Sequence, residues 1–231
     1  MSFIVIEGID RSGKSTQTKM LFDKLTKCGL STEMFSFPNY PSLTGKFISE
    51  HLHNQVFLTE NPQQNFLTIV KRTSSHDALV FQCVQTCDKY AMASKIMEVL
   101  RRGNTVVCDR WWQSAFVYGA DDGLDLQWLK DVHSCLPQAD LNLLLDLSPD
   151  EAAARTKRQI ESPHGSLDRY DRDLPKQRRL RDSYLKLWED QRKIQGQEAW
   201  KVLSVNATPE VVHERIVACV KDYLKRLCGK D

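Results

Sequence analysis

A glycine-rich run near the start of the chain has the residue types and the spacing of a phosphate-binding loop. Residues 8–15, GIDRSGKS, fit the pattern G-x-x-x-x-G-K-[ST], in which backbone N–H groups curl around a phosphate. Lys14 would supply a positive charge to the β- and γ-phosphates, and Ser15 a hydroxyl group to Mg²⁺. The sequence therefore predicts a nucleoside triphosphate site formed by Gly8, Ser12, Gly13, Lys14, Ser15 and Thr16.

An acidic and a basic residue stand together at the end of a later apolar run. Asp109 closes the run VVCD, and Arg110 follows it directly. A carboxylate at the end of a strand can hold the Mg²⁺ shell beside a phosphate loop. The planar guanidinium group of an arginine suits a second phosphate. We therefore predict Asp109 as a metal ligand and Arg110 as the clamp on an acceptor phosphate.

Five short apolar runs of the buried-strand type must carry these residues. Longer segments with helical periodicity separate the runs, so strands alternate with helices along the chain. This alternation is typical of an α/β protein whose parallel sheet is covered on both faces. No linker divides the chain, and we expect one domain over residues 1–231. The expected strands are residues 3–7, 33–37, 105–109, 141–147 and 201–205.

The bulk composition restricts the function classes. The net charge is +2, without the basic surplus that non-specific nucleic-acid binding needs, and no apolar run reaches the ~18 residues that span a membrane. The chain opens directly on an expected strand, so we predict no signal peptide. Its seven cysteines form no two C-x-x-C pairs, which favours free thiols in a reducing compartment. We expect a cytoplasmic enzyme that binds neither nucleic acid nor a membrane.

Four segments, taken in order, resemble the thymidylate kinase family. They are Gly8 to Thr16, Phe37-Pro38, Asp109-Arg110 and Arg169-Tyr170-Asp171. The order and approximate spacing hold from residue 3 to about residue 217. The resemblance implies a P-loop nucleoside-monophosphate kinase fold with a five-stranded parallel sheet and a lid at about residues 155–172. It also implies ATP with Mg²⁺ as co-substrate and dTMP as acceptor, and we expect a homodimer.

The same resemblance implies a role for each matching residue. On the ATP side, Arg11 reaches the transferring phosphate, Arg155 belongs to the lid, and Asn206 belongs to the turn beside adenine. The expected catalytic residues are Arg11, Lys14 and Arg110. The expected contacts of the acceptor nucleotide are Asp10, Phe37, Pro38, Tyr40, Phe81, Lys89, Arg110, Ser114, Tyr118, Tyr170 and Gln177.

Such a transfer needs little proton chemistry. A phosphate monoester has a second pKa near ~6, so the acceptor oxygen is already an anion at neutral pH and no general base is required. Catalysis then depends on alignment and on neutralising the charge that spreads over the γ-phosphoryl oxygens. This accounts for a candidate site that is rich in cations and poor in histidine.

The departures from the family pattern lie on the acceptor side. Tyr40 stands where the family has a second phosphate-binding arginine, and Lys89 stands where it has a base-reading arginine. The ring that stacks on thymine is expected near Gln85, and Phe81 is the nearest aromatic residue. Residues 53–80 resemble an insertion. We therefore expect relaxed base specificity, with dUMP accepted beside dTMP.

Two other functions also use such a loop. A deoxynucleoside kinase must deprotonate a hydroxyl group, and Glu7, directly before the loop, is the candidate base. A P-loop ATPase or switch protein would hydrolyse its nucleotide without needing a monophosphate. A Ras-like GTPase is disfavoured because the sequence has no N-K-x-D motif. Arg110, as a phosphate clamp, favours the monophosphate kinase over the deoxynucleoside kinase.

Overall fold

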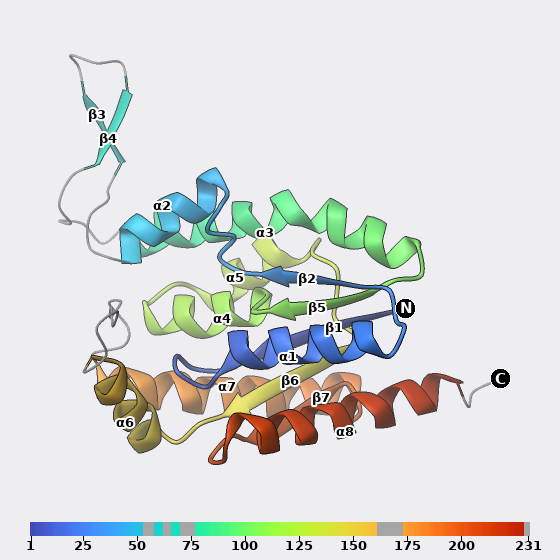
Figure 1. Cartoon of the computed structure of the whole chain (residues 1–231). Helices are drawn as coiled ribbons and strands as arrows, with labels where there is room; N and C mark the ends of the chain where they lie inside the picture. The colour runs from blue at the N-terminus through green and yellow to red at the C-terminus, as the bar shows by residue number, and fades with distance from the viewer. Residues whose placement is uncertain (53–57, 62–65, 70–76, 161–172, 229–231) are drawn as a thin grey trace.

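A five-stranded parallel sheet forms the centre of the molecule in the computed structural model (Figure 1). The structure describes residues 1–52, 58–61, 66–69, 77–160 and 173–228. The strands of the sheet are β1 (Ser2–Glu7), β2 (Thr32–Ser36), β5 (Thr105–Asp109), β6 (Leu141–Asp146) and β7 (Trp200–Ser204). Their spatial order is β2-β5-β1-β6-β7. All the predicted strands are thus confirmed, with bounds that differ by at most one residue at either end.

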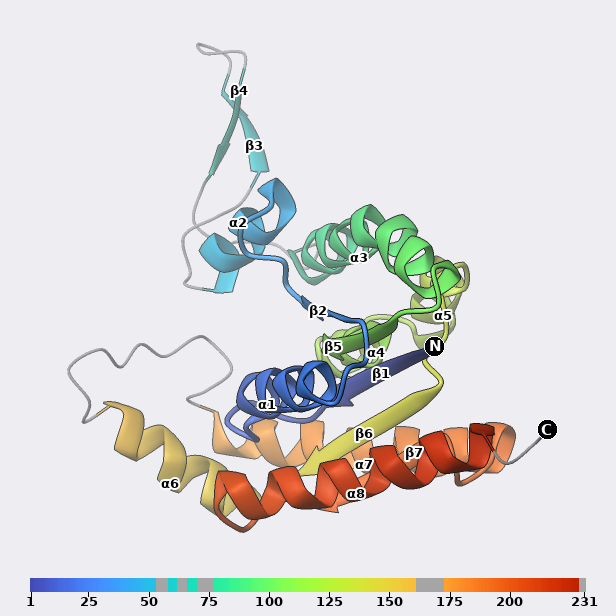
Figure 2. The same ribbon diagram turned by 45° about the vertical axis from the view of Figure 1, so that its right-hand side comes forward.

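Helices cover both faces of this sheet (Figure 2). The described helices are α1 (Lys14–Lys27), α2 (Leu43–Leu52), α3 (Asp77–Arg101), α4 (Trp112–Asp121), α5 (Leu126–His133), α6 (Pro149–Ile160), α7 (Leu174–Gln195) and α8 (Pro209–Cys228). None of these helices is long and apolar enough to cross a membrane. α1 and α8 pack side by side on one face, and α3, α4 and α7 lie on the other. Because both faces are covered, β1 and β5 are buried along their whole length.

The order of the strands reverses at β1, which places two loops next to each other. β1 pairs with β5 on one side and with β6 on the other, so that Ile6 lies opposite both Asp109 and Leu143. Connections that leave neighbouring parallel strands in opposite directions enclose a crevice at the carboxyl ends, where open α/β sheets bind ligands. The loop after β1 and the turn after β5 therefore meet at this crevice.

A small antiparallel hairpin lies within the predicted insertion. It consists of β3 (Leu58–Asn61) and β4 (Phe66–Ile69), between α2 and α3 (Figure 1). Since α3 begins at Asp77, the last residues of the predicted range 53–80 belong to that helix. The predicted lid at 155–172 begins inside α6, and its residues 161–172 lie outside the described residues.

The segment that follows β2 is held against α2 and α3 by closely spaced contacts. The N–H group of Asn39 donates to the buried carboxylate of Asp88 at 2.7 Å. The hydroxyl groups of Ser42 and Thr44 donate to the same carboxylate at 3.0 and 2.6 Å. Gly45 in α2 lies so close that a Cβ atom there would stand 1.9 Å from the Asn39 carbonyl oxygen. The first turn of α2 therefore fixes the position of the segment.

We expect Gly45→Ala to destabilise the protein, although alanine is the better helix former by about 1 kcal/mol. The added methyl group would overlap the Asn39 carbonyl oxygen, and overpacking of this kind costs about 1–3 kcal/mol. Calorimetric unfolding measures the difference. The matched control is Lys46→Ala, at the next and exposed position of the same helix. A Gly45→Ala protein as stable as the Lys46→Ala protein would contradict this packing.

Candidate active site

The loop between β1 and α1 has a backbone that depends on its glycines. Gly8 and Gly13 have φ angles of 151° and 89°, and Arg11 has a φ of 64°. A Cβ atom at Gly8 would stand 2.7 Å from both the Leu145 carbonyl oxygen and Ser12 Oγ, so a side chain does not fit there. Gly13 is the N-cap of α1, whose first N–H groups and helix dipole favour an anion. The predicted order of strand, glycine loop and helix is confirmed.

The ammonium group of Lys14 is buried within this loop. Its Nζ donates to the carbonyl oxygen of Ile9 at 2.7 Å. Burial and the nearby charge of Arg110 together lower the pKa of Lys14 to about 8, although the charge of Asp10 opposes both effects. An anion in the loop would therefore stabilise the charged form of this side chain.

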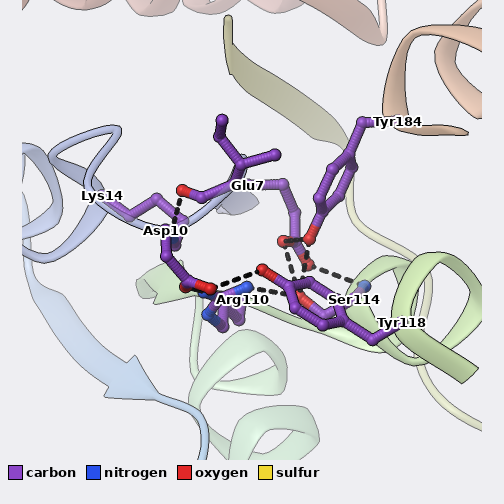
Figure 3. Close-up of polar contacts among 8 residues, drawn as sticks. Glu7, Asp10, Lys14, Arg110, Ser114, Tyr118 and Tyr184 are labelled. Carbon is purple, nitrogen blue, oxygen red and sulfur yellow. Dashed lines mark hydrogen bonds and ion pairs between the residues drawn. The ribbon is translucent and has the colours of Figure 1, made fainter. Parts of the chain in front are cut away.

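Arg110 faces the loop and contacts the carboxylate of Asp10 (Figure 3). Arg110 Nη1 also donates to Ser114 Oγ at 3.2 Å, and the guanidinium group lies 5.4 Å from the centre of the Tyr118 ring. The Tyr118 hydroxyl donates to Asp10 at 3.0 Å. Burial alone would raise the pKa of Asp10, but Arg110 and Lys14 hold that pKa below its ordinary value. The cluster thus keeps one ionised carboxylate beside two cations.

Asp109, at the end of β5, combines burial with an unused oxygen atom. Its Oδ1 has no hydrogen-bond partner within the described part of the chain. Burial raises the pKa of this carboxyl group, and Lys14 opposes that rise. Ser15, the other predicted metal ligand, is exposed in the first turn of α1. Among the described residues no group of three or more His, Cys, Asp or Glu side chains could hold a metal ion. One carboxylate and one hydroxyl still fit Mg²⁺, because this ion usually completes its shell with water and phosphate oxygens.

Glu7, the last residue of β1, is fully engaged within the protein. Its carboxylate accepts the backbone N–H groups of Trp111 and Ser114 at 2.8 and 3.2 Å. It also accepts the hydroxyl groups of Ser114 and Tyr184 at 2.7 and 2.9 Å (Figure 3). The side chain is completely buried. Glu7 is therefore not positioned to deprotonate a substrate hydroxyl, as a deoxynucleoside kinase would require.

A cavity of about 760 Å³ opens beside the loop and α6. Five residues predicted for ATP binding line it: Ser12, Gly13, Thr16, Arg155 and Asn206. Arg155 is held in place, because it donates to the carbonyl oxygens of Arg11 and Val205 at 3.1 and 2.9 Å. Gln17 and Glu151 also line the cavity, and Glu151 accepts from Arg155 at 3.1 Å. Neither residue could be predicted from the sequence, since polar side chains on amphipathic helices carry no motif.

A smaller cavity of about 90 Å³ lies beside Arg110 and Asp10. Six predicted acceptor residues line it: Asp10, Pro38, Tyr40, Arg110, Ser114 and Tyr118. Leu52, at the end of α2, and Gln85, in α3, complete the lining. Leu52 gives no sequence signal, because an apolar helix residue usually belongs to the core. The sequence predicts a stacking ring near Gln85, whereas in the structure the Gln85 side chain itself lines the cavity.

Two predicted aromatic residues lie behind this lining. Phe37 is buried and packs on Trp111, with ring centres 5.0 Å apart. Phe81 is buried and stacks on His51, with ring centres 4.1 Å apart. Tyr170 lies outside the described residues. Within the described part, the two rings support the wall of the smaller cavity and do not line it.

Lys89 and Gln177 also lie one layer away from the cavity. Lys89 is buried, and its Nζ donates to the carbonyl oxygen of Gln85 at 3.3 Å. Burial lowers the pKa of Lys89 to about 8, whereas the charge of Glu7 opposes this change. Gln177, on α7, is buried and hydrogen-bonds to Asp10 through its side chain. Lys89 therefore supports the lining residue Gln85, and Gln177 supports the lining residue Asp10.

Comparisons with known proteins agree on one family. A family model described as Thymidylate kinase matches residues 6–216. A probable thymidylate kinase of Pyrococcus abyssi is 33% identical over 224 residues, which cover 96% of this chain and 97% of that protein. The thymidylate kinase of Schizosaccharomyces pombe is 30% identical over 219 residues, which cover 95% of this chain and 91% of that protein. The solved thymidylate kinase of Candida albicans has a similar fold, with a TM-score of 0.67 and 21% identity over 96% of this chain and 91% of that chain.

We expect Tyr184→Phe to lower the free energy of unfolding by about 1–3 kcal/mol, because it removes a buried hydrogen-bond donor to the Glu7 side chain. The Tyr184 hydroxyl lies 2.9 Å from Glu7 and 3.0 Å from Ser114 Oγ. Denaturant unfolding monitored by circular dichroism measures the change. The control is Thr26→Val, which removes an exposed hydroxyl group from α1 and should change stability by less than about 0.5 kcal/mol. Equal stabilities of the two variants would count against a structural role for this hydroxyl.

Proposed function

Since the chain belongs to the thymidylate kinase family and transfers the γ-phosphoryl group of ATP to dTMP, we propose that the two cavities beside the phosphate loop divide the substrates between them. ATP binds in the larger cavity, and dTMP binds in the smaller one with its phosphate against Arg110. The observation that carries this assignment is that one loop lines both: Ser12 and Gly13 line the larger cavity, and Asp10 lines the smaller. The two phosphate groups would then meet at the loop, which is the alignment that the transfer needs.

On the ATP side, the backbone of the loop binds the phosphates through Gly8, Ser12, Gly13, Lys14, Ser15 and Thr16. Arg155 and Asn206 line the part of the cavity that would hold adenine. Arg155 also fixes the backbone of Arg11 by its 3.1 Å hydrogen bond to the Arg11 carbonyl oxygen. We propose that the Arg11 side chain then meets the charge that develops on the transferring phosphoryl group.

On the acceptor side, Arg110 binds the phosphate of dTMP. Asp10 and Tyr118, which hydrogen-bond to each other at 3.0 Å, are proposed to contact the sugar. Pro38, Tyr40 and Ser114 would complete the contacts that the cavity lining offers. The remaining predicted residues are proposed to support this wall from behind or from the lid: Phe37, Phe81, Lys89, Gln177 and Tyr170.

The chemistry that we propose is charge neutralisation without a general base. The attacking oxygen belongs to a phosphate that is already ionised at neutral pH. The protein supplies Lys14 and Arg110, and the charge of Arg110 lies close enough to lower the pKa of Lys14. Asp10 lies near both cations, which together hold the pKa of its carboxyl group below the ordinary value. The carboxylate of Glu7 already accepts hydrogen bonds from several protein donors, so it is not available as a general base. This observation supports the same mechanism.

We propose that Ser15 and Asp109 hold Mg²⁺. The unused and buried Oδ1 of Asp109 supports this assignment, because an orphaned carboxylate oxygen is costly unless a cation or a donor meets it. When bound with ATP, the ion would neutralise charge on the β- and γ-phosphates.

We also propose a homodimer formed through α3. The exposed side of this helix carries apolar side chains at helical spacing: Leu79, Val80, Cys83, Cys87 and Tyr90. Such a continuous apolar stripe on a surface helix is typical of a contact between protein chains. A cytoplasmic location is proposed as well, since the six cysteines whose side chains the structure describes are free thiols.

We expect the purified protein to release ADP from ATP and Mg²⁺ only when a nucleoside monophosphate is present. A coupled assay with dTMP, dUMP, AMP and thymidine measures this. The value of kcat/KM for dUMP should lie within about tenfold of that for dTMP, since the two bases differ by one methyl group. Rapid turnover of thymidine with dTMP inert would contradict the assignment of Arg110. ADP release without any acceptor would indicate an ATPase.

We expect light scattering to give about twice the chain mass of 26.6 kDa. A short bis-maleimide should then link two chains through Cys83 and Cys87, which lie on the exposed face of α3. The double variant Cys83→Ser/Cys87→Ser should lose the linked dimer. Cys28→Ser/Cys135→Ser, which removes two exposed thiols elsewhere, should keep it. A monomeric mass, or linking that depends on the second pair, would contradict the α3 interface.

A further inference from the structure

The lining of the smaller cavity combines a charged group with an uncharged group. The charged group consists of residues that contact one another: Asp10, Arg110, Ser114 and Tyr118. The uncharged group consists of Pro38, Tyr40, Leu52 and Gln85. With the phosphate of the nucleotide against Arg110, the uncharged group is the part of the lining left to the base.

Gln85 differs from the other members of that group. Pro38 and Leu52 offer apolar surface, and the Tyr40 side chain is 50% exposed. Gln85 is half-buried, and within the described ranges its carboxamide makes no hydrogen bond to the protein. It thus brings both a donor and an acceptor to the uncharged part of the lining without a competing partner.

Lys89 occupies a different position on the same side of α3. It is buried outside the lining, and its Nζ donates to the Gln85 carbonyl oxygen at 3.3 Å. This bond fixes the helical turn that carries Gln85. The base edge is therefore left to the Gln85 carboxamide, and Lys89 is a positioning residue behind it.

We propose that Gln85 reads the hydrogen-bonding edge of a pyrimidine base, and that the enzyme consequently accepts dCMP as well as dTMP and dUMP. This inference rests on the proposed placement of the acceptor. Thymine and uracil present an acceptor, O4, beside a donor, N3–H. Cytosine presents a donor, its amino group, beside an acceptor, N3. Half a turn of the carboxamide exchanges its oxygen and its NH₂ group, so one side chain can pair with either edge.

A cationic side chain at this place would act differently. Lysine and arginine offer donors only, so they would face the amino group of cytosine with another donor. Strict discrimination arises when a wrong substrate leaves buried polar groups unpaired. The Gln85 carboxamide removes that penalty for cytosine, because it leaves neither edge unpaired.

The test is kcat/KM for dTMP, dUMP and dCMP with the wild-type protein and with two variants. The wild-type value for dCMP should lie within about tenfold of that for dTMP, a difference of ~1.4 kcal/mol. Gln85→Glu keeps an acceptor for the cytosine amino group but opposes O4 of thymine. It should therefore raise the ratio of dCMP to dTMP by at least about tenfold. Gln85→Met, of similar length but without a hydrogen-bonding group, should lower both values and leave their ratio near one.

The matched control is Gln138→Glu, which adds the same charge at an exposed residue before β6, at the opposite end of the strands. It should leave all three values unchanged. A wild-type preference for dTMP over dCMP above about a thousandfold would overturn the proposal, as would a Gln85→Glu ratio equal to that of the wild type. Failure of the proposed function gives a different result, since dTMP itself would then support no ADP release in any of these proteins.

Discussion

The carboxylate of Glu7 joins the segments on which the site depends. Glu7 is the last residue of β1 and stands directly before the phosphate loop. Its carboxylate accepts a hydrogen bond from the N–H group of Trp111, which follows Arg110, and another from the hydroxyl group of Tyr184 on α7. A hydrogen bond to a buried charged group stabilises a protein by about 1.5–3 kcal/mol, and a buried carboxylate without such donors would be strongly unfavourable. The loop and the Arg110 turn are therefore held in a fixed relation. This support also explains how Arg110 can keep a φ of 66°, a conformation that costs energy in an unconstrained residue.

A second constraint is the balance of charge around the loop. Lys14 and Arg110 would repel each other in a buried site, and Asp10 offsets this repulsion. Tyr118 and Gln177 donate to Asp10 and keep it ionised. The cations are thus positioned before any phosphate arrives, so that little rearrangement is needed when the charge of the phosphoryl group spreads during transfer. Glu7 fixes the positions of the loop and of the Arg110 turn, and Asp10 reduces the repulsion between the two cations that these positions bring together.

The parts of the molecule that could be predicted from sequence are those governed by backbone requirements. Strands buried on both faces must be apolar throughout, and the loop must have glycine where a Cβ atom would meet Leu145 and Ser12. The face that a helix turns toward a cavity depends instead on packing between helices. Phe81 is the aromatic residue nearest in sequence to the expected stacking ring, but in the structure it stacks on His51, and Gln85 lines the cavity instead. The hairpin of β3 and β4 was missed because its short strands pair only with each other, outside the main sheet.

Features fixed by backbone requirements and features fixed by helix packing lie in different parts of the proposed acceptor site, so the base that is accepted can change without a change in the phosphate contacts. The proposed phosphate contacts depend on strand ends, a glycine loop without room for a Cβ atom at Gly8, and the buried Glu7. The proposed base contacts are side chains of α2 and α3, such as Leu52 and Gln85, which lie outside the sheet. Lys89 holds the turn of α3 from behind, so that a different side chain at the lining keeps the same backbone position. On the proposed placement of the substrates, the phosphate contacts and the base contacts of the acceptor therefore come from structurally separate elements, so that the base contacts can vary while the phosphate contacts stay constant.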